Sequence, residues 1–128
     1  MSNYGVEALT ALLSAPTTTT SPAVNQCQMS LKAHDDATIT FCQSRNITYE
    51  AYQVMKGCPF DDATVQRVAG DHNVSVGQVC ERYILQRGCA MAVGTGANSS
   101  TAGPYAAEDL DVFGFSLTDA EMKVLNSI

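Results

Sequence analysis

The 128-residue chain is poor in positive charge and has no tryptophan. Its 7 lysine and arginine residues are outnumbered by 13 aspartate and glutamate residues, which leaves a formal net charge of −6. An acidic domain repels the phosphate backbone of DNA and RNA. We therefore expect no nucleic-acid partner.

Long apolar runs are also missing. No stretch approaches the roughly 20 apolar residues that a membrane-spanning helix needs, so we expect no transmembrane segment. The N-terminus MSNYGVEALT lacks the charged leader and continuous apolar run of a secretory signal. Hydrophobic residues nevertheless make up 45% of the chain, which is enough for a core in a single domain over residues 1–128. These features favour an intracellular globular protein.

The cysteines show no paired spacing. Five are present, an odd number, and no two are arranged as C-x-x-C. This pattern predicts neither a disulfide framework nor a zinc site. We therefore expect all five to be free thiols in a reducing compartment: Cys27, Cys42, Cys58, Cys80 and Cys89.

The two histidines do not indicate a metal site either. His34 precedes Asp35 and Asp36, and a helix start explains these aspartates better than a metal cage would. His72 shares a predicted helical face with Val65, which indicates packing rather than catalysis. We expect no metal ion.

Helical and strand-like patterns alternate along the chain. Apolar spacing and capping residues predict helices over 4–14, from Asp35 or Asp36 to about Arg45, from Asp61 or Asp62, from Ser75 to Gly88, and from Thr118 to about Leu125. Strands are expected at 22–26, 47–52 and 89–93. A loop of small residues is expected at 94–103, with Pro104 opening a short helix. This order predicts an α/β fold with a parallel sheet of right-handed βαβ units.

Five segments, in order along the chain, resemble aldo-keto reductases. SNYGVEALTALL resembles the segment after their fifth barrel strand, PAVNQ their sixth strand, and EAYQVMKG their A-Y-S-P-L-G strand end. VQRVAGDHNVSVGQVCERYILQRG and EDLDVFGFSLTDAEM resemble two further C-terminal runs of that family. The resemblance implies the C-terminal half of a TIM barrel, with about three parallel strands and outer helices.

The resemblance also bears on catalysis. The family's catalytic Asp, Tyr, Lys and His lie in its first half, to which no residue of this chain corresponds, so no catalytic residue is expected here. This favours a catalytically inactive pseudoenzyme that serves as a structural or interaction subunit of a larger protein assembly. The alternative is a fragment, or a complementing half, of an NADPH-dependent aldo-keto reductase.

Some cofactor contacts of the family do correspond to residues of this chain. Ser2, Asn3 and Gln26 match the residues that hold the nicotinamide carboxamide, and Tyr52 matches the tyrosine that stacks on the ring. The family's Lys-Ser pair after the eighth strand reads Gly94 and Thr95 here.

The arginine that grips the 2′-phosphate in the family has no counterpart before Lys123. The loop GTGANSS at 94–100 lacks the full dinucleotide fingerprint, so a surface loop is expected. We therefore expect Ser2, Asn3, Gln26 and Tyr52 to be vestigial and no cofactor to be bound, with weak NADPH binding as the alternative.

Glu50 indicates an open sheet face. Residues 48, 50 and 52 share one face of their strand, so Glu50 points to the barrel axis if Tyr52 does. A closed barrel fills its interior with branched apolar residues, and an unpaired carboxylate there is costly. We therefore expect this face, and the open sheet edges at 22–26 and 89–93, to meet water, other subunits or a second copy of the chain.

Overall fold

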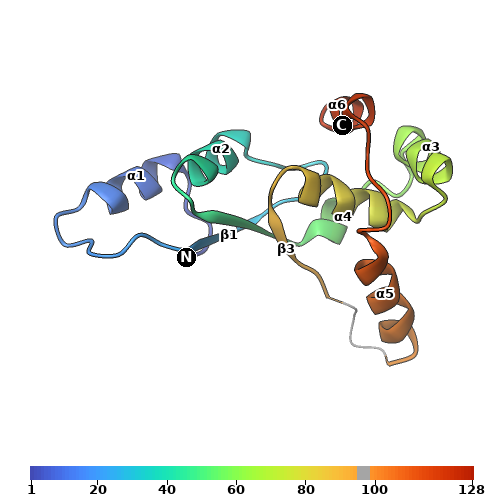
Figure 1. Ribbon diagram of the computed structural model, residues 1–128, viewed down its shortest axis with the longest axis horizontal. Coiled ribbons are helices and arrows are strands. Elements are labelled where there is room, and N and C mark those ends of the chain that lie inside the picture. The colour runs from blue at the N-terminus through green and yellow to red at the C-terminus, as the bar shows by residue number, and fades with distance from the viewer. Residues whose placement is uncertain (95–98) are drawn as a thin grey trace.

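The computed structural model describes residues 1–94 and 99–128. Within these residues it contains three strands: β1 (Val24–Gln28), β2 (Thr48–Tyr52) and β3 (Ala90–Ala92). The helices of this part are α1 (Val6–Ser14), α2 (Asp36–Ser44), α3 (Ala63–His72), α4 (Val76–Gln86), α5 (Ser99–Asp111) and α6 (Asp119–Leu125), with a short 3-10 helix η1 (Val54–Gly57). The molecule is elongated, with α1 at one end and α3, α5 and α6 around α4 at the other (Figure 1).

The strands form one open parallel sheet in the order β1-β2-β3. The register sets Gln26 beside Glu50 and Glu50 beside Ala90. The chain returns from β1 to β2 through α2, and from β2 to β3 through η1, α3 and α4. The predicted fold, an α/β partial barrel of about three parallel strands with outer helices, is confirmed.

The helix starts follow from local capping chemistry. Ser75 and Gln78 exchange reciprocal bonds between side chain and backbone, at 3.2 and 2.9 Å, before α4. Thr118 opens α6 with the same kind of capping box. Asp35 and Asp62 accept backbone N–H groups at the starts of α2 and α3. These caps satisfy N–H groups that have no partner within the helix, and they are as predicted.

The region around Pro104 differs from expectation. We expected a loop over 94–103 and a helix opening at Pro104, because proline lacks the N–H that a helix interior uses. Instead α5 begins at Ser99 and carries Pro104 within it. Ala102, Ala106 and Asp109 are half-buried at helical spacing, and packing of α5 on α4 extends the helix past the proline. The rest of the expected loop, residues 95–98, lies outside the described residues.

A disulfide joins Cys58 to Cys80, so the expectation of five free thiols is wrong for this pair. The bond ties the segment after η1 to α4 across 22 residues of sequence, with Cα atoms 5.9 Å apart. Only the tertiary fold brings the two cysteines together, so their spacing in the sequence did not predict the disulfide. Cys27, Cys42 and Cys89 are free and buried. The inference of a reducing compartment, which rested on free thiols throughout, loses that support.

The two faces of the sheet have different environments. Asn25 and Cys27 of β1 and Tyr49 and Ala51 of β2 point to the helices and are buried. Asn25 is completely buried, and its amide bonds both the N–H and the carbonyl oxygen of Tyr4, at 3.3 and 2.8 Å. Side chains of the alternate positions are exposed or half-buried. The core therefore lies on the helix side alone.

No helix in the part of the chain that the structure describes is long and apolar enough to cross a membrane.

Candidate functional site

The first three residues extend the sheet along β1. The Asn3 N–H donates to the Gln26 carbonyl at 2.8 Å, and the Gln26 N–H donates to the Met1 carbonyl at 2.9 Å. The N-terminal ammonium donates to the Val24 carbonyl, and Ser2 forms a parallel bridge with Gln26. The edge expected to be open at 22–26 is therefore paired, because the start of the chain supplies backbone groups in register. The other end of the sheet is β3.

The structure brings the four residues predicted at the cofactor site together. The Tyr52 hydroxyl donates to Oδ1 of Asn3 at 3.2 Å, and Nδ2 of Asn3 donates to the Ser2 hydroxyl at 3.1 Å. Asn3 also accepts the Gln28 N–H at 3.3 Å, so it joins the carboxyl ends of β1 and β2. Gln26 lies beside Ser2 through the bridge described above.

The backbone conformation of Asn3 determines where its side chain points. Its φ of 58° lies in the left-handed region, which asparagine tolerates better than most residues. This turn ends the edge pairing and directs the Asn3 amide toward Tyr52. Asn3 is exposed and Tyr52 is half-buried, so a ligand in solvent can reach both.

Glu50 has a partner on this face. Nε2 of Gln26 donates to its carboxylate at 3.2 Å, and the side chain is half-buried. The side chains of this face are exposed or half-buried, and the Glu50 carboxylate is not unpaired as expected. A cross-strand amide satisfies it, since the register sets Gln26 directly opposite. The face thus offers amide, hydroxyl and carboxylate groups beside one aromatic ring.

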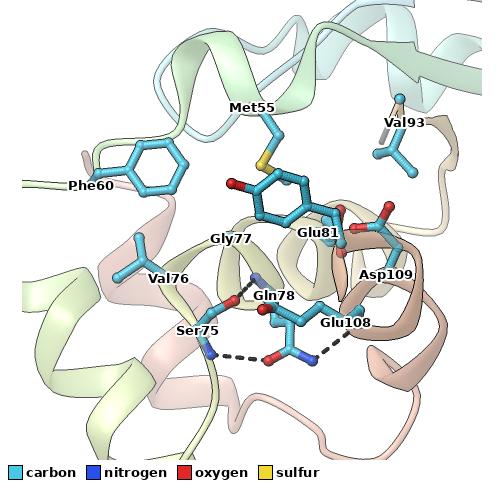
Figure 2. A pocket seen from close by; sticks show the side chains of 12 residues that line it. Met55, Phe60, Ser75, Val76, Gly77, Gln78, Glu81, Val93, Glu108 and Asp109 are labelled. Atoms are coloured by element: carbon cyan, nitrogen blue, oxygen red, sulfur yellow. Dashed lines mark hydrogen bonds between the residues drawn. The ribbon is translucent and has the colours of Figure 1, made fainter. Parts of the chain in front are cut away.

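A second feature, a pocket on the helix side, was not predicted. It encloses about 460 Å³ between η1, α4, α5 and the end of β3 (Figure 2). The side chains and backbone that line it are Met55, Phe60, Ser75, Val76, Gly77, Gln78, Glu81, Val93, Gly94, Tyr105, Glu108 and Asp109. We call it the acidic pocket, for its three carboxylates.

Glu81 is the unusual residue of the acidic pocket. It is only 1% exposed, and no donor among the described residues reaches either of its carboxylate oxygens. Burial, and then the neighbouring Asp109 carboxyl, raise the pKa of Glu81 to about 8. Because this pKa lies above 7, Glu81 is mainly protonated at neutral pH.

One sequence signal could have indicated the pocket. Gln78 and Glu81 lie three residues apart on α4 and are both buried, beside the apolar stripe of that helix. Nε2 of Gln78 donates to the Glu108 carbonyl at 3.1 Å, which ties α4 to α5. On its own, however, a polar pair beside an apolar stripe normally indicates a solvent-exposed helix face, so the signal was weak.

The histidines lie elsewhere. His72 is half-buried and bonds to Glu121 at 3.0 Å, linking α3 to α6 as a packing residue. His34 bonds to Asp36 at 2.8 Å beside the cap of α2. Within residues 1–94 and 99–128, no group of three or more His, Cys, Asp or Glu side chains is arranged to hold a metal ion.

Comparisons with known proteins agree with the fold. The chain is 33% identical over 128 residues to an uncharacterized oxidoreductase of Schizosaccharomyces pombe, covering 99% of this chain and 43% of the relative. It is 33% identical over 127 residues to an aldo-keto reductase of Mycolicibacterium smegmatis, covering 98% of this chain and 42% of the relative. The chain is related to the aldo-keto reductases. It spans less than half the length of these relatives, and no protein-family model matches it.

Solved structures of aldo-keto reductase type show the same architecture. A Gox0644 mutant in complex with NADPH is 28% identical, with a TM-score of 0.83 over 98% of this chain and 44% of that one. The aldo-keto reductase MGS-M4, from a deep-sea metagenome, has a TM-score of 0.84 at 24% identity, covering 98% of this chain and 45% of that one. The second likeness concerns the fold alone.

The expectation of no cofactor is overturned by these relatives. An NADPH-dependent codeinone reductase of Papaver somniferum is 28% identical over 136 residues, covering all of this chain and 40% of the relative. Together with the NADPH complex above, it points to NADPH rather than to no cofactor. The expectation had rested on Gly94 and Thr95 in place of the Lys-Ser pair, and on the missing counterpart of the arginine, all at one end of the cofactor site. Thr95 lies outside the described residues, and neither position belongs to the group Ser2, Asn3, Gln26 and Tyr52.

Proposed function

We propose that this chain supplies the nicotinamide-binding face of an NADPH-dependent oxidoreductase of aldo-keto reductase type. The observation that carries the proposal is the cluster of Ser2, Asn3, Gln26 and Tyr52, joined by the Asn3–Tyr52 hydrogen bond. The cluster lies at the carboxyl ends of parallel strands, where barrel enzymes carry their active sites.

The chemistry of the cluster suits a nicotinamide ring. A carboxamide has one acceptor oxygen and two N–H donors, and the side chains of Ser2, Asn3 and Gln26 offer both kinds of group. Tyr52 offers an aromatic face against which a planar ring can stack. The ring and the amides come from neighbouring strands, so the sheet fixes their spacing.

Hydride transfer needs groups that this chain does not supply. By resemblance, the family's catalytic Asp, Tyr, Lys and His belong to a region to which none of residues 1–128 corresponds. We therefore infer that the chain alone binds NADPH without reducing aldehydes or ketones, and that activity requires a complementing polypeptide segment.

A fluorescence titration with NADPH tests the proposal. Tyr52→Ala and Gln26→Ala should each weaken binding about tenfold or more, equivalent to about 1.4 kcal/mol. Phe113→Ala and Gln66→Ala are matched controls, because both side chains are exposed and outside the cluster. Equal affinities for all four variants and the unchanged chain would contradict the proposal.

A non-catalytic interaction subunit is the second candidate. It is favoured by the half-buried Gln26, Glu50 and Tyr52 on a parallel sheet, since such sheets usually have both faces covered. On this hypothesis residues 1–128 form one domain whose open face and β3 edge bind another protein or a second copy. Analytical ultracentrifugation tests it: association at micromolar concentration supports this candidate, and a monodisperse monomer with one sharp melting transition opposes it.

A further inference from the structure

A hydrogen bond across the open sheet face fixes the side chain of Gln26. Nε2 of Gln26 donates to the Glu50 carboxylate at 3.2 Å, and the register sets the two residues opposite each other. An ionised carboxylate accepts hydrogen bonds and has none to donate, so only the NH2 end of the Gln26 amide can face it. The amide oxygen of Gln26 therefore points away from Glu50.

The backbone of Gln26 is held as well as its side chain. Its N–H donates to the Met1 carbonyl at 2.9 Å, and its carbonyl accepts the Asn3 N–H at 2.8 Å. Among residues 1–94 and 99–128, no group donates to the Gln26 amide oxygen, although the side chain is only half-buried. This oxygen is the acceptor that Gln26 leaves for a ligand.

Glu50 has no competing partner on its other side. The register sets it opposite Ala90 of β3, whose side chain has no polar atom. None of the ion pairs in the described part of the chain involves Glu50. The carboxylate is half-buried, and a partly desolvated carboxylate gains more from a fixed donor than one fully in water does. Its bond to Gln26 is therefore expected to persist.

We propose that Glu50 is a positioning residue of the nicotinamide-binding face, which orients the Gln26 amide so that its oxygen meets the ligand. The inference rests on the proposed function and adds a specificity to it. A fixed acceptor oxygen selects a ring substituent with N–H donors, such as a carboxamide, over one without them. Without Glu50, the Gln26 amide can turn over and offer either end.

NMR of the Gln26 side-chain amide tests the orientation without any ligand. One of the two Hε2 protons should be shifted downfield by its bond to the carboxylate. Glu50→Met keeps a side chain of similar length but lacks the carboxylate oxygens, so it should remove this shift. Glu7→Met makes the same change at an exposed position on α1 and should leave the Gln26 signals as they are. Identical Gln26 signals in the original chain and in Glu50→Met would overturn the proposal.

Two cofactors test the specificity. NADPH carries a carboxamide, and its reduced 3-acetylpyridine analogue carries an acetyl group without N–H donors. The original chain should bind NADPH about tenfold more tightly than the analogue, and Glu50→Met should reduce this preference to about threefold or less. Both cofactors carry the same charge, so the lost charge of Glu50 cancels in the ratio of affinities. An undiminished preference in Glu50→Met would overturn the proposal.

A double variant shows whether Glu50 acts through Gln26. In the Gln26→Ala background, Glu50→Met should change the preference by less than about twofold, because the amide that it orients is gone. Additive effects would mean that Glu50 meets the ligand itself, and would overturn the positioning role. Glu50→Gln keeps one acceptor oxygen and should retain part of the preference. Failure of the proposed function would appear separately, as NADPH binding insensitive to Tyr52→Ala, and the ligand-free NMR result would still decide the orientation of Gln26.

Discussion

The open face of the sheet and the acidic pocket handle polar side chains in opposite ways. On the open face, Glu50 accepts from Gln26 and Tyr52 donates to Asn3. In the pocket, Glu81 is buried and lacks a donor among the described residues. The first arrangement is satisfied by neighbouring side chains, and in the second Glu81 keeps a proton at neutral pH. Substitutions in the open face and in the pocket should therefore change the unfolding free energy in different ways.

The largest effect is expected from the disulfide beside the pocket. The double variant Cys58→Ser, Cys80→Ser should lose about 3 kcal/mol of unfolding free energy, because the unfolded chain regains the freedom of a loop of 22 residues. Urea denaturation measures the loss. Reductant should destabilise the original chain and leave the double variant unchanged. If reductant lowers both stabilities alike, the disulfide is not the cause.

Glu81 should make stability depend on pH. Its pKa is raised by burial, and then by Asp109, to about 8, so the folded state holds a proton that the unfolded state releases near its ordinary pKa of 4.5. Stability should fall as pH rises between these values, because the folded state retains a proton that the unfolded state has already released. Thermal melts at several pH values measure it, and Glu81→Gln should flatten the profile. A rise in stability with pH that depends on Glu81 would contradict the assignment.

Glu50→Gln tests whether a carboxylate on the open face of the sheet contributes to stability. Because Glu50 is half-buried and already bonded to Gln26, its neutral counterpart keeps most contacts. The variant should change the unfolding free energy by less than about 0.5 kcal/mol, with no change in pH profile. If Glu50→Gln lowered the unfolding free energy as much as the rise in pH is expected to do through Glu81, the carboxylates of the two regions would contribute to stability in the same way.

Short-range patterns made most of the fold predictable. The caps at Ser75 and Thr118 involve partners three residues away, and alternation along 47–52 separates the buried Tyr49 from the half-buried Glu50. The four residues of the proposed nicotinamide-binding face came from the family resemblance, and the structure brings them together.

Contacts between distant residues account for what sequence reasoning missed. The Cys58–Cys80 bond closes over 22 residues, and Met1 pairs with the β1 edge at Val24, 23 residues away. The acidic pocket is assembled from η1, α4, α5 and the end of β3, of which only Gln78 and Glu81 share a local pattern. None of these contacts follows from spacing, because the tertiary fold alone sets the distances.

Saturation-transfer NMR with NADPH is the most direct test of the proposed nicotinamide-binding face. The nicotinamide ring protons should receive saturation from the protein, since the ring is proposed to stack on Tyr52 beside Asn3 and Gln26. In Tyr52→Ala this transfer should fall strongly, while in Phe113→Ala it should persist. Absence of transfer to the nicotinamide protons, or equal transfer in Tyr52→Ala and the original chain, would contradict the nicotinamide-binding face.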